Sequence, residues 1–126
     1  MSASADDGLP QLDPDRGLEV SLDEVGQLLD AGAVPEGVRL IDCREEDEFA
    51  ICQLPGAELV ALSTFAERDF SLLLEKGTAV VVYCHHGMRS AQAAHFLRGK
   101  GYGLAFSMAG GIDGWSREID PAVARY

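Results

Sequence analysis

The sequence predicts one α/β domain in which a parallel β-sheet of about five strands is flanked by α-helices on both faces. The first observation is the continuous apolar run Val80-Val81-Val82-Tyr83, which is typical of a strand buried on both faces of a parallel sheet. The second is the order that follows it, a short polar loop and then an alanine-rich helical segment. The third is the length, because 126 residues, 47% of them hydrophobic, suffice for one core and would be cramped as two domains.

The first third of the domain reads as strand, helix, strand. Leu18-Glu19-Val20 is expected to be a short strand. Ser21 and Glu24 form a capping-box pattern, and apolar residues then recur at helical spacing as far as Ala31. The apolar run at 38–42 predicts the second strand, which ends on an aspartate.

The middle of the chain alternates in the same way. The acidic segment 45–50 is expected to form a short helix with Phe49 buried, and 58–60 a short strand. A serine or threonine at 63–64 can cap a third helix, whose apolar residues continue until the chain reaches Gly77.

The last third holds the central strand and the elements that follow it. The central strand is expected at 78–83 and a helix at 89–100, whose small alanines permit close approach to the sheet. A further strand is expected at 104–106. A glycine pair then turns the chain into a last helix that carries Trp115, and 119–126 is expected to pack down as a C-terminal tail.

Composition restricts the partners and the compartment. Ten basic against 21 acidic residues give a net charge of −11, which argues against nucleic acid or an anionic membrane as a partner. We expect residues 1–17, which are acidic and poor in apolar side chains, to be a flexible arm, and 18–126 to be the domain. No bilayer-length apolar run and no signal peptide is evident, and three cysteines do not suggest a disulfide framework. We therefore expect a cytoplasmic protein.

The loop after the central strand is the candidate site. Cys84 ends that strand, and ligand sites in parallel α/β folds lie beyond the carboxyl ends of the strands. Inward-facing loop amides and the start of the next helix would stabilise a thiolate, the nucleophilic form of cysteine. Gly87 supplies backbone freedom for a tight loop, and Arg89 adds a permanent cation. The alternative is that Cys84 is an ordinary buried cysteine at a strand end.

Two histidines follow the cysteine and raise the question of a metal. Consecutive residues rarely converge on one ion, and His95 is the one other histidine of the chain, so we expect no metal site. His85 and His86 are instead expected to donate hydrogen bonds or partial positive charge at the mouth of the loop, or to be solvated. Met88 is expected to be an apolar residue at its rim.

Four motifs follow one another in order: Leu40-Ile41-Asp42-Cys43-Arg44-Glu45, Leu54-Pro55-Gly56-Ala57, Tyr83-Cys84-His85-His86-Gly87-Met88-Arg89-Ser90 and Ala109-Gly110-Gly111-Ile112-Asp113-Gly114-Trp115. Together they resemble the motifs of the single-domain rhodaneses, and the likeness runs from about Leu18 to the C-terminus. The resemblance implies a rhodanese-like domain with sulfurtransferase activity and no cofactor. In such a protein the loop cysteine accepts a sulfane sulfur from a donor such as thiosulfate, as a persulfide, and passes it to a thiol or to cyanide.

The same resemblance assigns roles to residues of this chain. It implies that Cys84 is the catalytic residue. The loop residues expected to bind the anionic donor and the persulfide are His85, His86, Gly87, Met88, Arg89 and Ser90. It also suggests that Asp42 and Arg44 brace the neighbouring loops; the alternative is a surface ion pair between Arg44 and a glutamate at 45, 46 or 48.

Two other functions stay open at this point. The chain could be a sulfur-relay or redox-sensing module that serves a protein partner, with little turnover of thiosulfate. A phosphatase is disfavoured, because four residues separate Cys84 from Arg89 where cysteine-based phosphatases need five. Cys43 and Cys52 could act as resolving thiols or could be packing residues.

Overall fold

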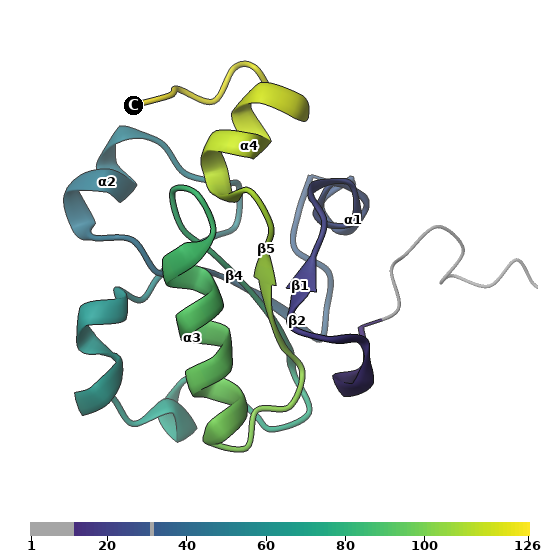
Figure 1. Ribbon diagram of the computed structural model, residues 1–126, viewed down its shortest axis with the longest axis vertical. Coiled ribbons are helices and arrows are strands. Elements are labelled where there is room, and N and C mark those ends of the chain that lie inside the picture. The colour runs from purple at the N-terminus through teal and green to yellow at the C-terminus, as the bar shows by residue number, and fades with distance from the viewer. Residues whose placement is uncertain (1–11, 31) are drawn as a thin grey trace, which may run out of the picture.

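Five parallel strands form one sheet, in the order β1-β5-β4-β2-β3, in a computed structural model that describes residues 12–30 and 32–126 (Figure 1). The strands are β1 (Glu19–Val20), β2 (Val38–Asp42), β3 (Glu58–Leu59), β4 (Ala79–Tyr83) and β5 (Ala105–Met108). The predicted parallel α/β fold is confirmed, and the strand predicted as central, β4, lies in the middle of the sheet.

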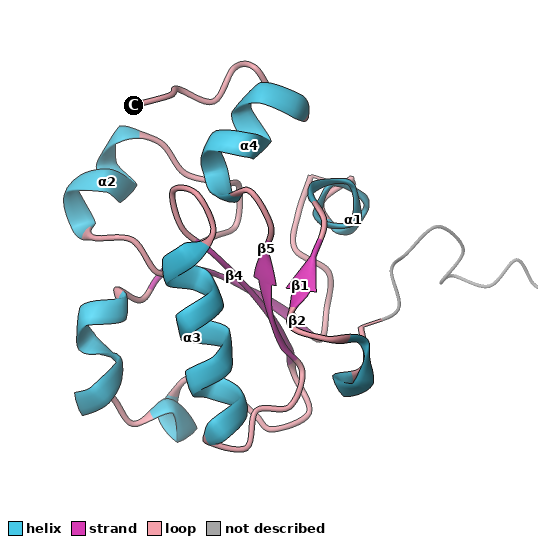
Figure 2. Ribbon diagram, in the orientation of Figure 1, coloured by secondary structure: helices cyan, strands magenta, loops and turns pink. Residues whose placement is uncertain are grey.

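Helices cover both faces of this sheet (Figure 2). The α-helices are α1 (Leu22–Leu28), α2 (Glu46–Ile51), α3 (Met88–Gly99) and α4 (Gly111–Glu118). Short 3₁₀-helices are η1 (Pro14–Arg16), η2 (Leu62–Glu67) and η3 (Phe70–Leu72). Buried residues of α3, η2 and η3 form one hydrophobic core, and those of α1 and α4 form the other, on the opposite face.

Strand β4 shows why a continuous apolar run marks the centre of such a sheet. Val80 and Val82 face the core beneath α3, whereas Val81 and Tyr83 face the core beneath α1 and α4. All five residues of β4 are buried, so neither face of the strand tolerates a solvated polar side chain.

Parallel pairing brings the carboxyl ends of β2 and β4 together. Asp42 aligns with Tyr83, and the amide of Cys43 donates to the Tyr83 carbonyl oxygen at 3.0 Å. The loop that follows β4 lies between α2 and α4 at this edge (Figure 1). Residues far apart in the sequence therefore meet around the end of β4.

The helix predicted from 63–64 to Gly77 is wrong, because the structure has η2 and η3 there, separated by extended residues. Phe65 and Phe70 both enter the core and meet edge to face, with ring centroids 4.8 Å apart. Five residues of α-helix would turn these two side chains about 140° apart. Asp69 also accepts from the amide of Ser71, which starts a new turn.

Smaller differences concern boundaries and burial. The capping box of Ser21 and Glu24 is present, but α1 ends at Leu28, three residues before the predicted end. Phe49, which was predicted to be buried, is only half-buried, because α2 lies at the rim of the sheet and buries none of its residues fully. Strand β5 extends beyond the prediction to Met108.

The arm predicted at 1–17 falls largely outside the described residues, so its boundary with the domain stays a prediction. In residues 12–17, Leu12 packs against the core and Asp13 caps η1. Arg16 pairs with Glu24 of α1 at 2.7 Å. None of the helices in the described ranges combines the length and hydropathy needed to cross a bilayer.

Candidate active site

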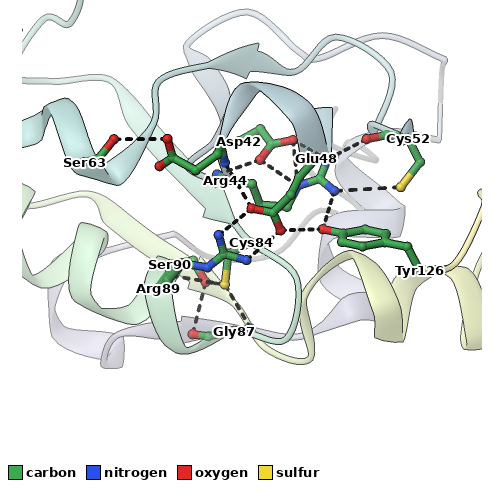
Figure 3. Close-up of polar contacts among 11 residues, drawn as sticks. Asp42, Arg44, Glu48, Cys52, Ser63, Cys84, Gly87, Arg89, Ser90 and Tyr126 are labelled. Carbon is green, nitrogen blue, oxygen red and sulfur yellow. Dashed lines mark hydrogen bonds and ion pairs between the residues drawn. The ribbon is translucent and has the colours of Figure 1, made fainter. Parts of the chain in front are cut away.

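Cys84 lies at the carboxyl end of β4 with its sulfur at the foot of the following loop. The residue is 1% exposed. The amide of Gly87 donates to the sulfur at 3.1 Å and that of Ser90 at 3.3 Å. The Ser90 hydroxyl lies 3.5 Å from the same atom. The sulfur is therefore buried and contacted by two backbone amide donors (Figure 3), and the catalytic role of Cys84 stays a prediction.

The loop takes this shape because of a glycine and a serine at the start of α3. Gly87 has a φ of +111°, a backbone conformation that residues with a side chain rarely adopt. This conformation directs the Gly87 amide toward the sulfur. The Ser90 hydroxyl donates to the Gly87 carbonyl oxygen at 3.1 Å and contacts the Ser107 hydroxyl of β5 at 2.7 Å. Fully buried, Ser90 fixes the first turn of α3 to the neighbouring strand.

Helix α4 holds the other side of the loop through its glycine pair. The amide of Ile112 donates to the Cys84 carbonyl oxygen at 2.8 Å, and that of Asp113 to the His85 carbonyl oxygen at 3.0 Å. Gly111 allows this approach, since a β-carbon there would overlap the carbonyl group of His85. The first amides of α4 thereby fix the backbone on which the cysteine sits.

The surroundings of Cys84 favour its ionised form. A hydrogen bond with the Cys43 thiol, together with the donors from Ser90 and Gly87, lowers the pKa of Cys84 to about 4 although burial opposes this. The pKa of Cys43 is raised, first by the same hydrogen bond and then by burial, so Cys43 keeps its proton. One thiolate and one thiol therefore lie side by side at neutral pH.

This pairing predicts a low-pH titration of one thiol. Because the folded pKa of Cys84 lies below that of an ordinary cysteine, the thiolate is present at neutral pH and is lost as the pH falls through about 4. The ultraviolet absorbance of the thiolate, recorded as wild type minus Cys84→Ser, should show that midpoint. Cys52→Ser is the control and should keep it. A midpoint near the ordinary value of about 8.5 would contradict the site described.

The guanidinium group of Arg89 is engaged by a glutamate that we did not predict for the site. It binds Glu48 of α2 through two hydrogen bonds of 2.7 and 2.9 Å, and the Tyr126 hydroxyl donates to the same carboxylate at 2.8 Å (Figure 3). Arg89 first, and then other hydrogen bonds, lower the pKa of Glu48 to about 2, so this carboxylate is charged throughout the physiological range. The charge that Arg89 brings to the loop is therefore largely compensated.

The two histidines and the methionine occupy the outside of the loop. The His85 ring lies between those of His86 and Tyr126, with both centroid distances 3.9 Å. Burial and then His86 lower the pKa of His85, which favours its neutral form. His86 is exposed and lies 4.0 Å from Asp113, and Met88 is 79% exposed. In residues 12–30 and 32–126, no three potential metal ligands are grouped around an ion site.

Asp42 and Arg44 form a buried ion pair at the end of β2. Their closest atoms are 2.6 Å apart and both side chains are fully buried. Arg44 also donates to the Cys52 carbonyl oxygen at 2.5 Å and to the Tyr126 hydroxyl at 2.7 Å. The alternative of a surface pair with a glutamate at 45–48 is thus wrong, because Arg44 points inward to Asp42. Bracing of the loops by this pair stays a prediction.

The structure brings together most of the predicted residues and adds others. Cys84, Gly87 and Ser90 meet at the sulfur, whereas the side chains of Met88 and His86 are exposed. Residues that were not predicted for the site are Glu48 on Arg89, Ser107 beneath Ser90, and Tyr126. Cys43, for which the sequence left a resolving thiol or a packing residue open, lies beside the sulfur. The position of Cys43 after β2, beside β4 in the sheet, is the one signal that could have placed it next to Cys84.

The molecule is thus a parallel α/β domain with a cysteine sulfur held by two backbone amides at the carboxyl edge of its sheet. The family model of the rhodanese-like domain matches residues 21–118. The chain belongs to this family. The predicted resemblance is thereby confirmed.

Several relatives are similar over most of their length. The thiosulfate sulfurtransferase GlpE of Haemophilus influenzae is 32% identical over 108 residues, which are 86% of this chain and 96% of that protein. A sulfurtransferase of Allochromatium vinosum is 34% identical, over 84% of this chain and 94% of the relative. The structure of the human single-domain sulfurtransferase TSTD1 is 27% identical in sequence, with a TM-score of 0.66, over 81% of this chain and 97% of the TSTD1 chain. Other curated relatives are longer, and the chain spans 22% to 37% of their length.

Proposed function

We propose that this protein is a sulfurtransferase that moves a sulfane sulfur from thiosulfate or a persulfide donor to a thiophilic acceptor. The Cys84 thiolate would attack the outer sulfur of the donor and form a persulfide, and for thiosulfate the leaving group is sulfite. A thiol or cyanide then takes the outer sulfur and regenerates the thiolate. The similarity to single-domain sulfurtransferases supports this class of reaction.

One observation carries the proposal: two backbone amides converge on the sulfur of a cysteine whose pKa is lowered to about 4. These amides are fixed by the backbone, and Ser90 is also held by Ser107, so they need no reorganisation when negative charge moves on to a bound sulfur. No cofactor takes part in the proposed transfer. We also propose a cytoplasmic location, where the three free thiols would stay reduced.

The test of this proposal is the mass of the intact protein after exposure to thiosulfate. One added sulfur atom per chain is expected, and peptide mapping should locate it on Cys84. The mass should return to its original value on addition of cyanide, with formation of thiocyanate. A protein that gains no sulfur from thiosulfate or from a small persulfide would refute the assignment.

A second candidate is a relay or redox-sensing module that exchanges sulfur with a protein partner and turns over little thiosulfate. The observation that favours it is the ion pair between Arg89 and Glu48, since thiosulfate is a dianion and finds less free positive charge. Comparing the rate of persulfide transfer to small thiols with that to candidate partner proteins would separate the two.

The same ion pair yields a prediction for Glu48→Gln. Loss of the carboxylate leaves the Arg89 charge uncompensated, so the KM for thiosulfate should fall about fivefold, roughly 1 kcal/mol. Steady-state kinetics with thiosulfate and cyanide measure it. Glu46→Gln makes the same charge change on an exposed position of α2 and should leave the KM unchanged. Equal effects of both variants, or none, would show that Arg89 does not act on the donor.

A further inference from the structure

A second cysteine lies against the nucleophile, and the proposed transfer does not consume its thiol. Cys43 follows β2 and is 0% exposed. Its side chain enters the same hydrophobic core as that of Cys84, and the interaction between the two raises the pKa of Cys43 and lowers that of Cys84. Reagents from solvent therefore cannot reach Cys43 easily, whereas Cys84 is in contact with it.

The sheet itself sets this contact. Asp42 at the end of β2 aligns with Tyr83 at the end of β4. The residues that follow these two strands, Cys43 and Cys84, are therefore also neighbours. Both side chains enter the core beneath α3, as Ile41 and Val82 do two residues earlier. Neighbouring strands lie about 4.8 Å apart, within the roughly 4.4–6.8 Å between Cα atoms that a disulfide spans.

The state of Cys84 decides what Cys43 can do. While Cys84 is a thiolate, the Cys43 thiol donates to it and keeps its proton, so the pair is inert. A persulfide places the negative charge on the outer sulfur and makes the inner Cys84 sulfur electrophilic, with sulfide as the leaving group. Contact between the two residues then favours attack over any encounter with a solvent thiol.

We propose that Cys43 is a resolving thiol, which attacks the inner sulfur of a Cys84 persulfide when no acceptor arrives, forms a Cys43–Cys84 disulfide and releases sulfide. The inference rests on the proposed function, because it begins from the persulfide. It adds a second reaction to the site, acceptor-independent discharge of the bound sulfur.

The step balances without another reactant. The bond between the Cys84 sulfur and the outer sulfur breaks, and a bond between the Cys43 and Cys84 sulfurs forms. The outer sulfur leaves with the electron pair of the broken bond and with the Cys43 proton, as the hydrosulfide ion (HS⁻), which takes up any further proton from water. The two cysteines are oxidised to a disulfide, and the sulfane sulfur is reduced. An external dithiol would restore both thiols by exchange.

The experiment loads the full chain with thiosulfate and then removes sulfite and excess donor by gel filtration. Samples are alkylated with N-ethylmaleimide over time, mapped as peptides without reduction, and assayed for sulfide. Wild type should lose its persulfide as a Cys43–Cys84 cross-linked peptide appears, with one sulfide per cross-link. In Cys43→Ser, which keeps a hydroxyl donor, no cross-link should form and the persulfide should last at least about tenfold longer.

Matched variants and the opposite outcomes complete the test. Cys52→Ser removes the third cysteine, which lies outside the sulfur's contacts, and should behave as wild type. Cys43→Ala replaces Cys43→Ser if the latter does not fold. A wild-type persulfide that persists without a cross-link would overturn the resolving role alone. A wild type that gains no sulfur and releases no sulfide would overturn the proposed function, and the resolving role with it.

Discussion

Cys84→Ser should abolish sulfur transfer, with a fall in turnover on the order of 10⁴-fold or more, as expected when a nucleophile is removed. A serine hydroxyl is not ionised near neutral pH and cannot carry a persulfide, although it would fit among the same donors from Gly87 and Ser90. The measurement is the rate of thiocyanate formation from thiosulfate and cyanide, with intact mass as a second readout.

The controls for this variant separate loss of chemistry from loss of structure. Cys52→Ser makes the same substitution at a position without contact to the Cys84 sulfur, and should keep turnover. Cys84→Ser should unfold at a similar urea concentration to wild type, since it changes one buried atom. Retained thiocyanate formation in Cys84→Ser would mean that another group carries the sulfur.

Arg44→Leu should lower the free energy of unfolding by about 3–5 kcal/mol, because it leaves the Asp42 carboxylate buried without its partner. The substitution also removes the hydrogen bonds to the Cys52 carbonyl oxygen and to Tyr126. Urea unfolding followed by circular dichroism measures the change.

Two comparisons test that the buried charge is the cause. Arg39→Leu breaks a pair with Glu58 whose side chains are 34% and 39% exposed, and should cost no more than about 1 kcal/mol. In a double variant, Asp42→Leu on the Arg44→Leu background, much of the lost stability should return, because no unpaired charge remains. Equal losses for Arg39→Leu and Arg44→Leu would contradict this account of the pair.

The fold could be predicted because its main signals are local. The apolar run of β4, the capping box at Ser21 and the glycines around 110 each act within a few residues. The same holds for the loop, since Gly87 and Ser90 lie three and six residues from Cys84 and are held by the start of α3. The prediction from helical periodicity failed at Phe65 and Phe70, because their packing against each other in the core is incompatible with a continuous α-helix.

The rest of the site depends on pairs that no local pattern encodes. Glu48 and Arg89 are 41 residues apart, and Arg44 and Tyr126 are 82 apart. The sequence analysis assigned Arg89 no counterion, because Glu48, which pairs with it, lies on another helix. Cys43 touches Cys84 through strand register, and register depends on the whole sheet.

The position of β1 at one edge of the sheet has a consequence for how the protein folds. β1 pairs only with β5 among the described strands, in a register that aligns Glu19 with Ser107. Ser107 is also the residue beneath Ser90. During synthesis, β1 has no strand to pair with, and Ser90 has no contact with Ser107, until β5 has been made. Folding therefore depends on contacts distant in sequence and should be slow for a domain of this size.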